Sequence, residues 1–301
     1  PMMEAEILHF SVPGGTPELP VVHAVVGPTA SGKTAWGIQW ALQLQTEIIN
    51  ADARQVYAEM RIGVARPSEE ELSAVPHHLI GHRSIHQPYT AADYAREARE
   101  ALQHVVAKTG TAVVVGGSGL YLLAALEGLD EVPPTPPEVR GHWEAVFAAE
   151  GLQGLQRRVA DRDPDYWATV DQKNPRRLLR ALEVMEQTGA TFSELRRGRV
   201  GDRPFAVAYH RLVPDRAALR QRIERRVAAM AGAGLVQEVR NLEPFKELTA
   251  LQTVGYREFY QTWDAGGSGQ TALDLVALRT AQYARRQETW LNKYVGSPSA
   301  R

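Results

Sequence analysis

One octet decides the fold of this chain: Gly27-Pro28-Thr29-Ala30-Ser31-Gly32-Lys33-Thr34, which fits the phosphate-loop pattern GxxxxGK(S/T). It lies between the apolar run Val21–Val26 and the helix-like segment Ala35–Leu44. A glycine-rich turn between a strand and a helix directs several backbone N–H groups at one point, where the helix dipole favours negative charge. Lys33 adds a cation, and Thr34 adds a hydroxyl suited to a phosphate-bound magnesium ion. The octet therefore predicts a binding site for a diphosphate or a triphosphate.

The composition is that of a globular protein. The chain has 301 residues, of which 44% are hydrophobic, enough for a large core and two domains. No apolar run approaches the roughly 20 residues of a membrane span. The absence of cysteine excludes disulfides, cysteine catalysis and thiolate metal sites. The opening segment, Pro1–Pro20, lacks the basic and apolar regions of a signal peptide, so we expect a loose leader and a cytoplasmic protein without a membrane partner.

The charge is divided unevenly along the chain, although the net charge is only −1. Residues 1–130 hold 8 basic and 14 acidic side chains, whereas residues 131–301 hold 26 and 21. Between Lys173 and Arg226 there are 14 basic and 6 acidic residues, a balance of +8. This asymmetry is typical of a surface that binds a polyanion, but a solvated arginine-rich face would have the same composition.

The first third of the chain alternates strand and helix signals, as a parallel α/β sheet requires. A helix that begins at Thr90, with Asp93 completing a capping box, places Tyr94, Ala98, Leu102 and Val105 on one face. The strands of this region are predicted at 21–26, 46–50 and 111–115.

The pattern changes after residue 130. Residues 130–137 hold four prolines and indicate a linker, and the pattern is then helical to about residue 198. A strand signal returns at Phe205–Val213, followed by helices at about 215–231 and 271–294. We therefore predict an α/β fold with a P-loop NTPase-like parallel-sheet core and an inserted all-helical domain. The core is assigned to residues 1–130 and 203–301, and the insertion to residues 131–202.

Two further segments bear on the chemistry of the phosphate loop. Asp52 follows the strand at 46–50, and ligands of open parallel sheets bind beyond the carboxyl ends of the strands. A carboxylate there is suited to be a general base or a magnesium partner, or it merely forms a turn. The strand at 111–115 ends in Gly116-Gly117-Ser118-Gly119, without the acidic residue that helps nucleotide hydrolases hold magnesium. This weakens an ATPase or GTPase interpretation.

The two long C-terminal helices carry arginines beside apolar stripes. Arg226 lies one turn after Arg222 and either clamps a phosphate or is solvated. We interpret Trp290 and Tyr294 as core residues, and the nine histidines, which lack metal-ligand spacing, as structural or surface residues. The predicted stripes consist of Leu219, Ile223, Val227 and Met230 in one helix and Leu273, Val276, Tyr283 and Trp290 in the other. On the residues discussed so far, two alternative functions stay open. One is a small-molecule kinase that uses ATP, and the other is a non-catalytic, nucleotide-gated RNA-binding module.

A series of short segments, kept in order from Gly27 to Trp290, resembles the tRNA dimethylallyltransferases, also called isopentenyl-tRNA transferases. The chain lacks the C-terminal zinc-finger extension of some eukaryotic relatives, so the resemblance is to the bacterial type. The matching segments are Gly27–Thr34, Asp52–Tyr57, Met60–Gly63, Pro76–Leu79, Tyr89–Tyr94, Val115–Tyr121, Asn174–Arg177, Arg180–Glu183, Gln221–Arg226, Gln252–Arg257 and Tyr283–Trp290.

The resemblance implies transfer of the dimethylallyl group of dimethylallyl diphosphate to N6 of the adenosine on the 3′ side of the tRNA anticodon, with release of diphosphate. It implies that Asp52 is the general base and that Thr29 and Arg226 stabilise the departing diphosphate. The octet Gly27–Thr34 would bind an isoprenoid diphosphate rather than ATP, and Thr34 would be a ligand of Mg²⁺. We expect the enzyme to be a monomer.

The resemblance also implies how tRNA is bound. The helical insertion would hold the anticodon stem-loop, and the target base would be flipped into a channel through the core, because N6 is inaccessible in a stack. Ala53, Arg66, Ser118 and Asn292 replace residues more usual in the family, namely serine, lysine, threonine and arginine. Ala53 removes one hydroxyl from the base-recognition loop, and Asn292 would weaken one phosphate contact. The implied tRNA contacts are Asp52, Ala53, Arg54, Gln55, Ser118, Arg140, Arg176, Arg177, Leu178, Leu179, Arg180, Gln252, Thr253, Val254, Gly255, Tyr256 and Arg257.

Overall fold

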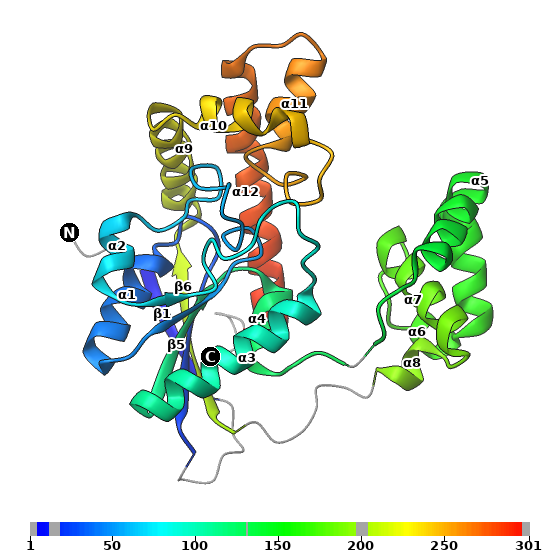
Figure 1. Ribbon diagram of the computed structural model, residues 1–301, viewed down its shortest axis with the longest axis horizontal. Helices are drawn as coiled ribbons and strands as arrows, with labels where there is room; N and C mark the ends of the chain where they lie inside the picture. Colours follow the sequence, from blue (N-terminus) through cyan, green and yellow to red (C-terminus); the bar gives the residue numbers. More distant parts are fainter. Residues whose placement is uncertain (1–4, 12–18, 131, 197–203, 297–301) are drawn as a thin grey trace. The chain divides into compact units, whose positions relative to one another are not determined.

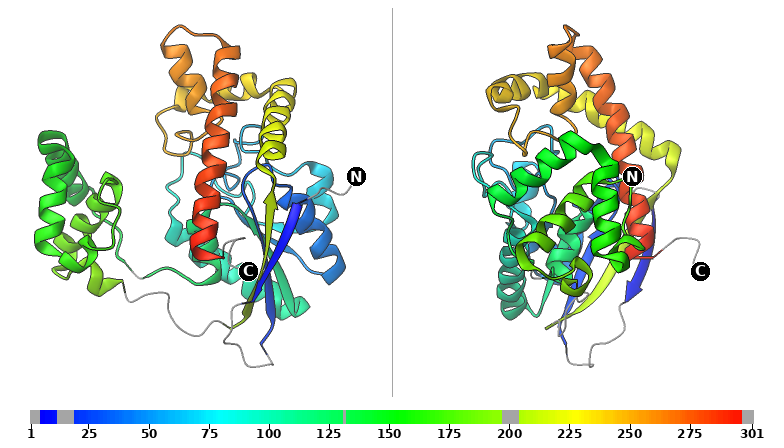
Figure 2. Two further views of the ribbon diagram at one scale, coloured as in Figure 1. Left: turned by 180° about the vertical axis from the view of Figure 1, so that it is seen from behind. Right: turned by 90° about the vertical axis from the view of Figure 1, so that its right-hand side faces the viewer.

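The structure is a computed structural model that describes residues 5–11, 19–130, 132–196 and 204–296. Its contacts divide the chain into two compact units (Figures 1 and 2). The first, called here the α/β unit, comprises Pro1–Glu127 and Arg203–Arg301, and the second, the helical unit, comprises Gly128–Asp202. The insertion predicted at 131–202 falls within the helical unit.

The α/β unit is built on one six-stranded sheet with the order β1-β6-β2-β5-β3-β4. All neighbouring strands are parallel except β1, which runs antiparallel to β6. The predicted α/β class with a parallel sheet is therefore confirmed. The strands are β1 (Ala5–Ser11), β2 (Val21–Val26), β3 (Ile48–Ala51), β4 (His77–His78), β5 (Thr111–Gly116) and β6 (Ala206–Pro214).

The expected loose leader is wrong for residues 5–11, which form the edge strand β1. The strand pairs with β6 in a register that runs from Ala5 opposite Pro214 to Ser11 opposite Ala208. Its sequence, AEILHFS, contains no proline and several residues that favour strands. The pairing partner lies about 200 residues away in sequence, so local sequence features alone did not reveal it.

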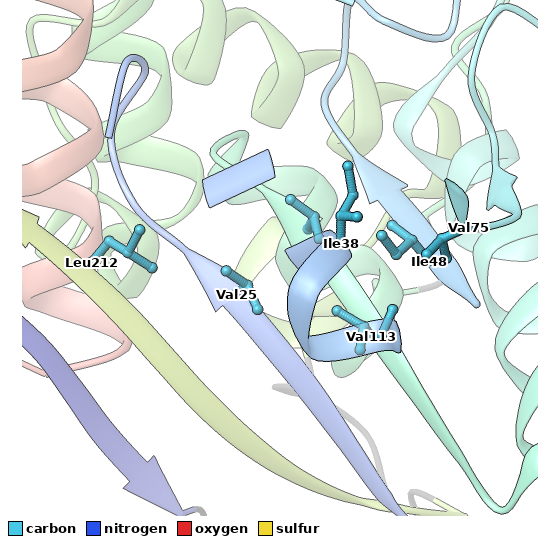
Figure 3. Close-up of a cluster of buried hydrophobic side chains, with 8 residues drawn as sticks. Val25, Ile38, Ile48, Val75, Val113 and Leu212 are labelled. Carbon is cyan, nitrogen blue, oxygen red and sulfur yellow. The ribbon is translucent and has the colours of Figure 1, made fainter. Parts of the chain in front are cut away.

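Helices cover both faces of the sheet (Figure 1). On one face, Ile38 of α1 (Lys33–Leu44) packs with Val25, Ile48 and Val113 from three neighbouring strands (Figure 3). On the other face lie α3 (Ala91–Thr109) and α4 (Gly119–Leu126), both in contact with β3 and β5. The capping box of Thr90 and Asp93 is present. The predicted stripe of α3 is confirmed, because Tyr94, Ala98, Leu102 and Val105 are fully buried.

The long helices α9 and α12 pack against each other after the last strand (Figure 1). The predicted stripe of α9 is confirmed for Leu219, Ile223 and Val227, which are buried. The other helices of the α/β unit are α2 (Glu69–Ala74), α10 (Leu235–Leu242), a 3₁₀ turn η1 (Glu243–Phe245) and α11 (Arg257–Asp264), and the two long helices are α9 (Arg216–Gly232) and α12 (Gly269–Tyr294).

The apolar line predicted for α12 covers only part of its buried face, since Leu273, Tyr283 and Trp290 are partly buried. Of its four members only Val276 is buried, and Tyr294, interpreted above as a core residue, is 37% exposed and stacks on Trp290. Small alanines and a glutamine face the neighbouring elements, where a search for large apolar residues overlooks them. The buried residues of α12 are Ala272, Val276, Ala284, Gln287 and Leu291.

The helical unit has its own core and, within residues 132–196, no strand. Trp143 and Leu155 of α5 pack with Leu178 and Leu182 of α7 in one cluster. Gly151 adopts φ 64° inside α5 and joins its two halves. The helices are α5 (Pro137–Arg162), α6 (Pro164–Trp167), α7 (Pro175–Thr188) and α8 (Phe192–Leu195). Nowhere in the described residues is a helix both long and apolar enough to cross a membrane.

Candidate active site at the phosphate loop

Three adjacent strands end at one level and thereby assemble the site. Val26 of β2 and Ala51 of β3 are both register partners of Gly116, the last residue of β5. The phosphate loop, the Asp52 turn and the Gly117–Ser118 turn follow these residues directly. The edge predicted from the parallel strand pattern therefore brings the three segments together.

The phosphate loop leaves donors free for an anion. Gly32, the N-cap of α1, has φ 91°, which favours glycine, and no side chain caps the helix. The first turn of α1 also carries no acidic residue. Because the first N–H groups of a helix have no partner within it, they point at any anion bound in the loop.

The loop tip is held between α9 and α12. Ala30, in the left-handed region at φ 62°, is buried against Leu219 and Ile223 of α9 and Ala284 of α12. The Nη1 atom of Arg226 donates to Thr29 Oγ1 at 3.3 Å. The structure thus brings together the two residues expected to stabilise a leaving group.

Lys33 and Arg226 lie within electrostatic reach of Asp52. Burial lowers the pKa of the Lys33 ammonium to about 8, with Asp52 opposing the shift and Arg226 adding to it. Burial also lowers the pKa of the Arg226 guanidinium, against the influence of Glu71 and Asp52. The Lys33 ammonium itself donates to the carbonyl of Pro28 at 3.2 Å. Two cations and one carboxylate therefore share a partly buried volume beside the loop.

Asp52 is partly buried and uses one oxygen to form a turn. Its Oδ1 accepts from the N–H groups of Arg54 at 2.8 Å and Gln55 at 3.3 Å. No described residue donates to Oδ2. Ser118 Oγ accepts from the N–H of Ala53 at 3.1 Å, which ties the Asp52 turn to the end of β5. The turn-forming and base interpretations are thus compatible, because they use different oxygens.

Several implied tRNA contacts in the α/β unit have structural partners of their own. Arg54 donates to the carbonyls of Thr249 and Ala250, and Gln55 donates to those of Val64 and Ala65. Gln252 is exposed, whereas Thr253, Val254 and Arg257 are partly buried and Gly255 is buried. The implied contact from the side chain of Tyr256 needs correction, because this ring is fully buried and its hydroxyl donates to Glu238 Oε1 at 2.6 Å.

In the helical unit, the implied contacts fall into three groups. Arg176 and Arg177 are exposed in the first turn of α7. Arg140 and Arg180 lie 4.0 and 3.8 Å from the buried carboxylate of Glu183, which offsets part of their charge. Leu178 is fully buried, so its implied contact is corrected: the side chain is part of the core and cannot meet a ligand. Leu179 is partly buried against the same core.

Two functional-site neighbours were not identified from the sequence. Glu238 accepts from the N–H groups of Arg61, Ile62 and Gly63 and fixes the loop that they form. Gln287 accepts from the N–H of Thr29 and donates to the carbonyl of Gly117. Gln287 lies within Tyr283–Trp290, one of the segments that resemble the family, and no other feature of the sequence indicated it. No feature of the sequence indicated Glu238.

The comparison with protein families decides the assignment. The family model described as IPP transferase matches residues 55–294, well over half of the chain. The chain belongs to the IPP transferase family. This IPP transferase is 41% identical over 269 residues to a tRNA dimethylallyltransferase of Christiangramia forsetii, covering 89% of each chain. It is 39% identical over 284 residues to a tRNA dimethylallyltransferase of Pelodictyon phaeoclathratiforme, covering 91% of this chain and 89% of the relative.

Solved structures show the same fold for this IPP transferase. The tRNA isopentenylpyrophosphate transferase of Bacillus halodurans superposes with a TM-score of 0.64 at 30% identity, covering 91% of this chain and 87% of that one. A eukaryotic dimethylallyltransferase crystallised while acting on tRNA superposes with a TM-score of 0.79 at 23% identity, covering 92% and 71%. The P-loop NTPase-like core expected from the octet is thereby confirmed.

Proposed function

We propose that the protein transfers the dimethylallyl group of dimethylallyl diphosphate to N6 of the adenosine on the 3′ side of the tRNA anticodon. The observation that carries this proposal is the convergence of the Thr29–Arg226 pair and the free oxygen of Asp52 on one phosphate loop. A kinase gains no support, because the relatives that match most of this chain are named tRNA dimethylallyltransferases.

The leaving-group half of the site is electrostatic. When the C1–O bond of the substrate breaks, negative charge grows on the diphosphate oxygen, where donors fixed in advance stabilise it. The Thr29 hydroxyl, the Arg226 guanidinium and the first N–H groups of α1 are such donors. The hydroxyl of Ser31 is fully buried and has no partner among the described residues, so a phosphate oxygen would satisfy it.

The nucleophile half requires a base. The N6 amine attacks C1, a C–N bond forms, and the amine must lose one proton to become the neutral product. Asp52 Oδ2 is suited to accept that proton, since Oδ1 is already engaged by the turn. The protein would thus take up the proton on one side of the substrate and hold the diphosphate on the other.

Magnesium fits this site as a partner of the substrate. No group of three or more His, Asp or Glu side chains suited to a metal exists in the described residues, so a ready-made protein cage is not what holds the ion. Thr34 supplies a hydroxyl oxygen in the first turn of α1, and Mg²⁺ prefers oxygen ligands. Thr34 and the diphosphate oxygens would hold the ion, which would neutralise charge on the leaving group.

The helical unit would bind the anticodon stem-loop through the exposed Arg176 and Arg177. Arginine forks bind phosphate oxygens in pairs, and the target base must leave its stack to reach Asp52. We further propose that the protein acts on tRNA in the cytoplasm as a monomer.

The test uses dimethylallyl diphosphate labelled in its isoprenoid part and tRNA that lacks the modification. We expect the label to enter the tRNA at the adenosine beside the anticodon, with magnesium present and without strong competition by ATP. Omission of tRNA is the control. Turnover of ATP without any isoprenoid in the RNA would favour the kinase instead.

A further inference from the structure

Gln287 is a buried polar residue on α12, with 6% of its surface exposed. Its Oε1 accepts from the N–H of Thr29 at 2.7 Å, and its Nε2 donates to the carbonyl of Gly117 at 2.8 Å. A backbone N–H only donates and a carbonyl only accepts, so both contacts are satisfied in a single orientation of the amide. The side chain is therefore a fixed bridge between two backbone segments.

The two segments belong to opposite halves of the site. Thr29 carries the hydroxyl that accepts from Arg226, on the leaving-group side. Gly117 precedes Ser118, whose Oγ accepts from the N–H of Ala53 and so holds the turn that positions Asp52. Gln287 thus connects the residues that would hold the diphosphate to the loop that would supply the base.

The loop needs such a support. Ala30, next to Thr29, has φ 62°, a conformation that a non-glycine residue adopts only at a cost of order 1 kcal/mol. Because Gln287 occupies the N–H of Thr29, only the Thr29 hydroxyl remains for the leaving group. The amide therefore decides which group of Thr29 is presented, as well as where the residue lies.

The absence of a side chain at Gly117 permits this contact. A Cβ atom at position 117 would lie 2.4 Å from Gln287 Nε2 and 3.1 Å from the carbonyl oxygen of Gly27. Only glycine allows the amide to approach the turn closely enough to bond its carbonyl. This gives a physical reason for a glycine in the turn after β5, where nucleotide hydrolases carry an acidic residue.

We propose that Gln287 is a positioning residue of the transfer reaction, which keeps the Thr29–Arg226 pair and the Asp52 turn at a fixed separation. This inference rests on the proposed function. Reacting groups must be held within fractions of an ångström, and a displacement of about 1 Å lowers rates by about 10²-fold. Gln287 acts through Thr29 and Gly117, without touching the reacting atoms itself.

The test measures single-turnover transfer at saturating dimethylallyl diphosphate and tRNA. Gln287→Leu, which removes both hydrogen bonds, is expected to lower this rate by about 10²-fold. The dissociation constants of dimethylallyl diphosphate and tRNA should change by less than about threefold, so that the loss appears in the chemical step. Gln287→Glu keeps the acceptor for Thr29 and removes only the donor to Gly117. We expect its single-turnover transfer rate to fall as well. This second variant keeps the test available if the leucine variant does not fold.

The matched control is Gln282→Leu, on the same helix, where the amide only accepts from the exposed Arg279; it should keep the wild-type rate. Gly117→Ala should reproduce the loss, and a double-mutant cycle with Gln287→Ala should show that the two losses are not additive. A wild-type rate in both Gln287 variants, or equal losses in rate and in both affinities, would overturn the inference. Absence of transfer by the wild-type protein would instead overturn the proposed function.

Discussion

At the scale of the residue, Asp52 separates two tasks between its two oxygens. Asp52→Asn keeps an oxygen that accepts from Arg54 and Gln55, so the turn is preserved while the base is lost. We expect turnover to fall by at least about 10²-fold, the usual effect of losing a general base, with tRNA still bound. Asp52→Ala loses the turn as well and should be weaker in tRNA binding. Unchanged turnover of the asparagine variant in the label-transfer assay would exclude the base role.

Lys33 gives the site a dependence on pH with a defined sign. Its pKa of about 8 in the free protein means that the ammonium loses its charge as the pH rises through 8. A diphosphate favours the charged form, and its own last ionisation, with a pKa of about 6, is largely complete by pH 7. The dissociation constant of dimethylallyl diphosphate should thus be nearly constant around pH 7, be about twofold higher at pH 8, and rise by up to about tenfold per pH unit above that.

Calorimetric titration without tRNA measures this dependence. Lys33→Arg supplies the control, because a guanidinium stays charged throughout this range and its profile should be flat. A flat profile for the wild-type protein up to pH 10 would contradict the assignment of Lys33 to the diphosphate.

Site residues were predictable from the sequence where they belong to a motif or follow the end of a strand. Thr29 and Lys33 belong to a pattern with a physical meaning, and Asp52 follows a strand end, so their proximity was predicted; in the structure Lys33 lies within electrostatic reach of Asp52. Gln287 is a buried and Glu238 a partly buried polar residue, and both are held by long-range contacts. Apart from the family segment that contains Gln287, nothing in the neighbouring sequence distinguishes the two residues from solvated ones, since their backbone partners at Thr29, Gly117 and residues 61–63 lie far along the chain.

At the scale of the element, helices were predictable where the buried face consists of regularly spaced apolar residues. The α3 stripe of Tyr94, Ala98, Leu102 and Val105 is such a face, and α3 packs against α4, β5 and β3. The helix α12 meets α9, α11 and α4 along its length, so its buried face includes small and polar residues. Periodicity of large apolar residues identifies only part of the buried face of such a helix.

Glu238 shows how one element can fix a loop. Its carboxylate accepts from three consecutive N–H groups, those of residues 61–63, and from the hydroxyl of Tyr256. Glu238→Ala should lower the free energy of unfolding by about 2 to 3 kcal/mol, because it leaves the hydroxyl of the buried Tyr256 and the partly buried N–H groups of Ile62 and Gly63 without this partner. Denaturant titration measures this, and Glu224→Ala is the control, since its exposed pair with Arg220 contributes at most about 1 kcal/mol. Equal stability of the two variants would show that the loop does not depend on Glu238.

At the scale of the whole molecule, the division into two units follows from changes in composition along the chain and from the order of its strands. The proline-rich linker, the helical pattern after it and the returning strand predicted a helical insertion in a parallel α/β core. The contacts of the chain separate Gly128–Asp202 from the rest. The edge strand β1 was missed because its partner β6 comes after the whole insertion. Long-range pairing is the part of a topology that local signals cannot supply.

The basic charge of the region around α7 predicts contacts between its exposed arginines and the phosphates of tRNA. Arg176 and Arg177 are exposed, whereas Arg180 donates to the carbonyl of Pro133 at 3.0 Å and faces the buried Glu183. Replacing Arg176 and Arg177 by alanine should weaken tRNA binding and reduce the slope of log K against log salt by about 1 for each lost phosphate contact. Arg180→Ala, in contrast, should mainly destabilise the docking of the linker on α7. Filter binding of tRNA from low to high salt measures the slope, and an unchanged slope in the double variant would show that these arginines do not meet phosphate.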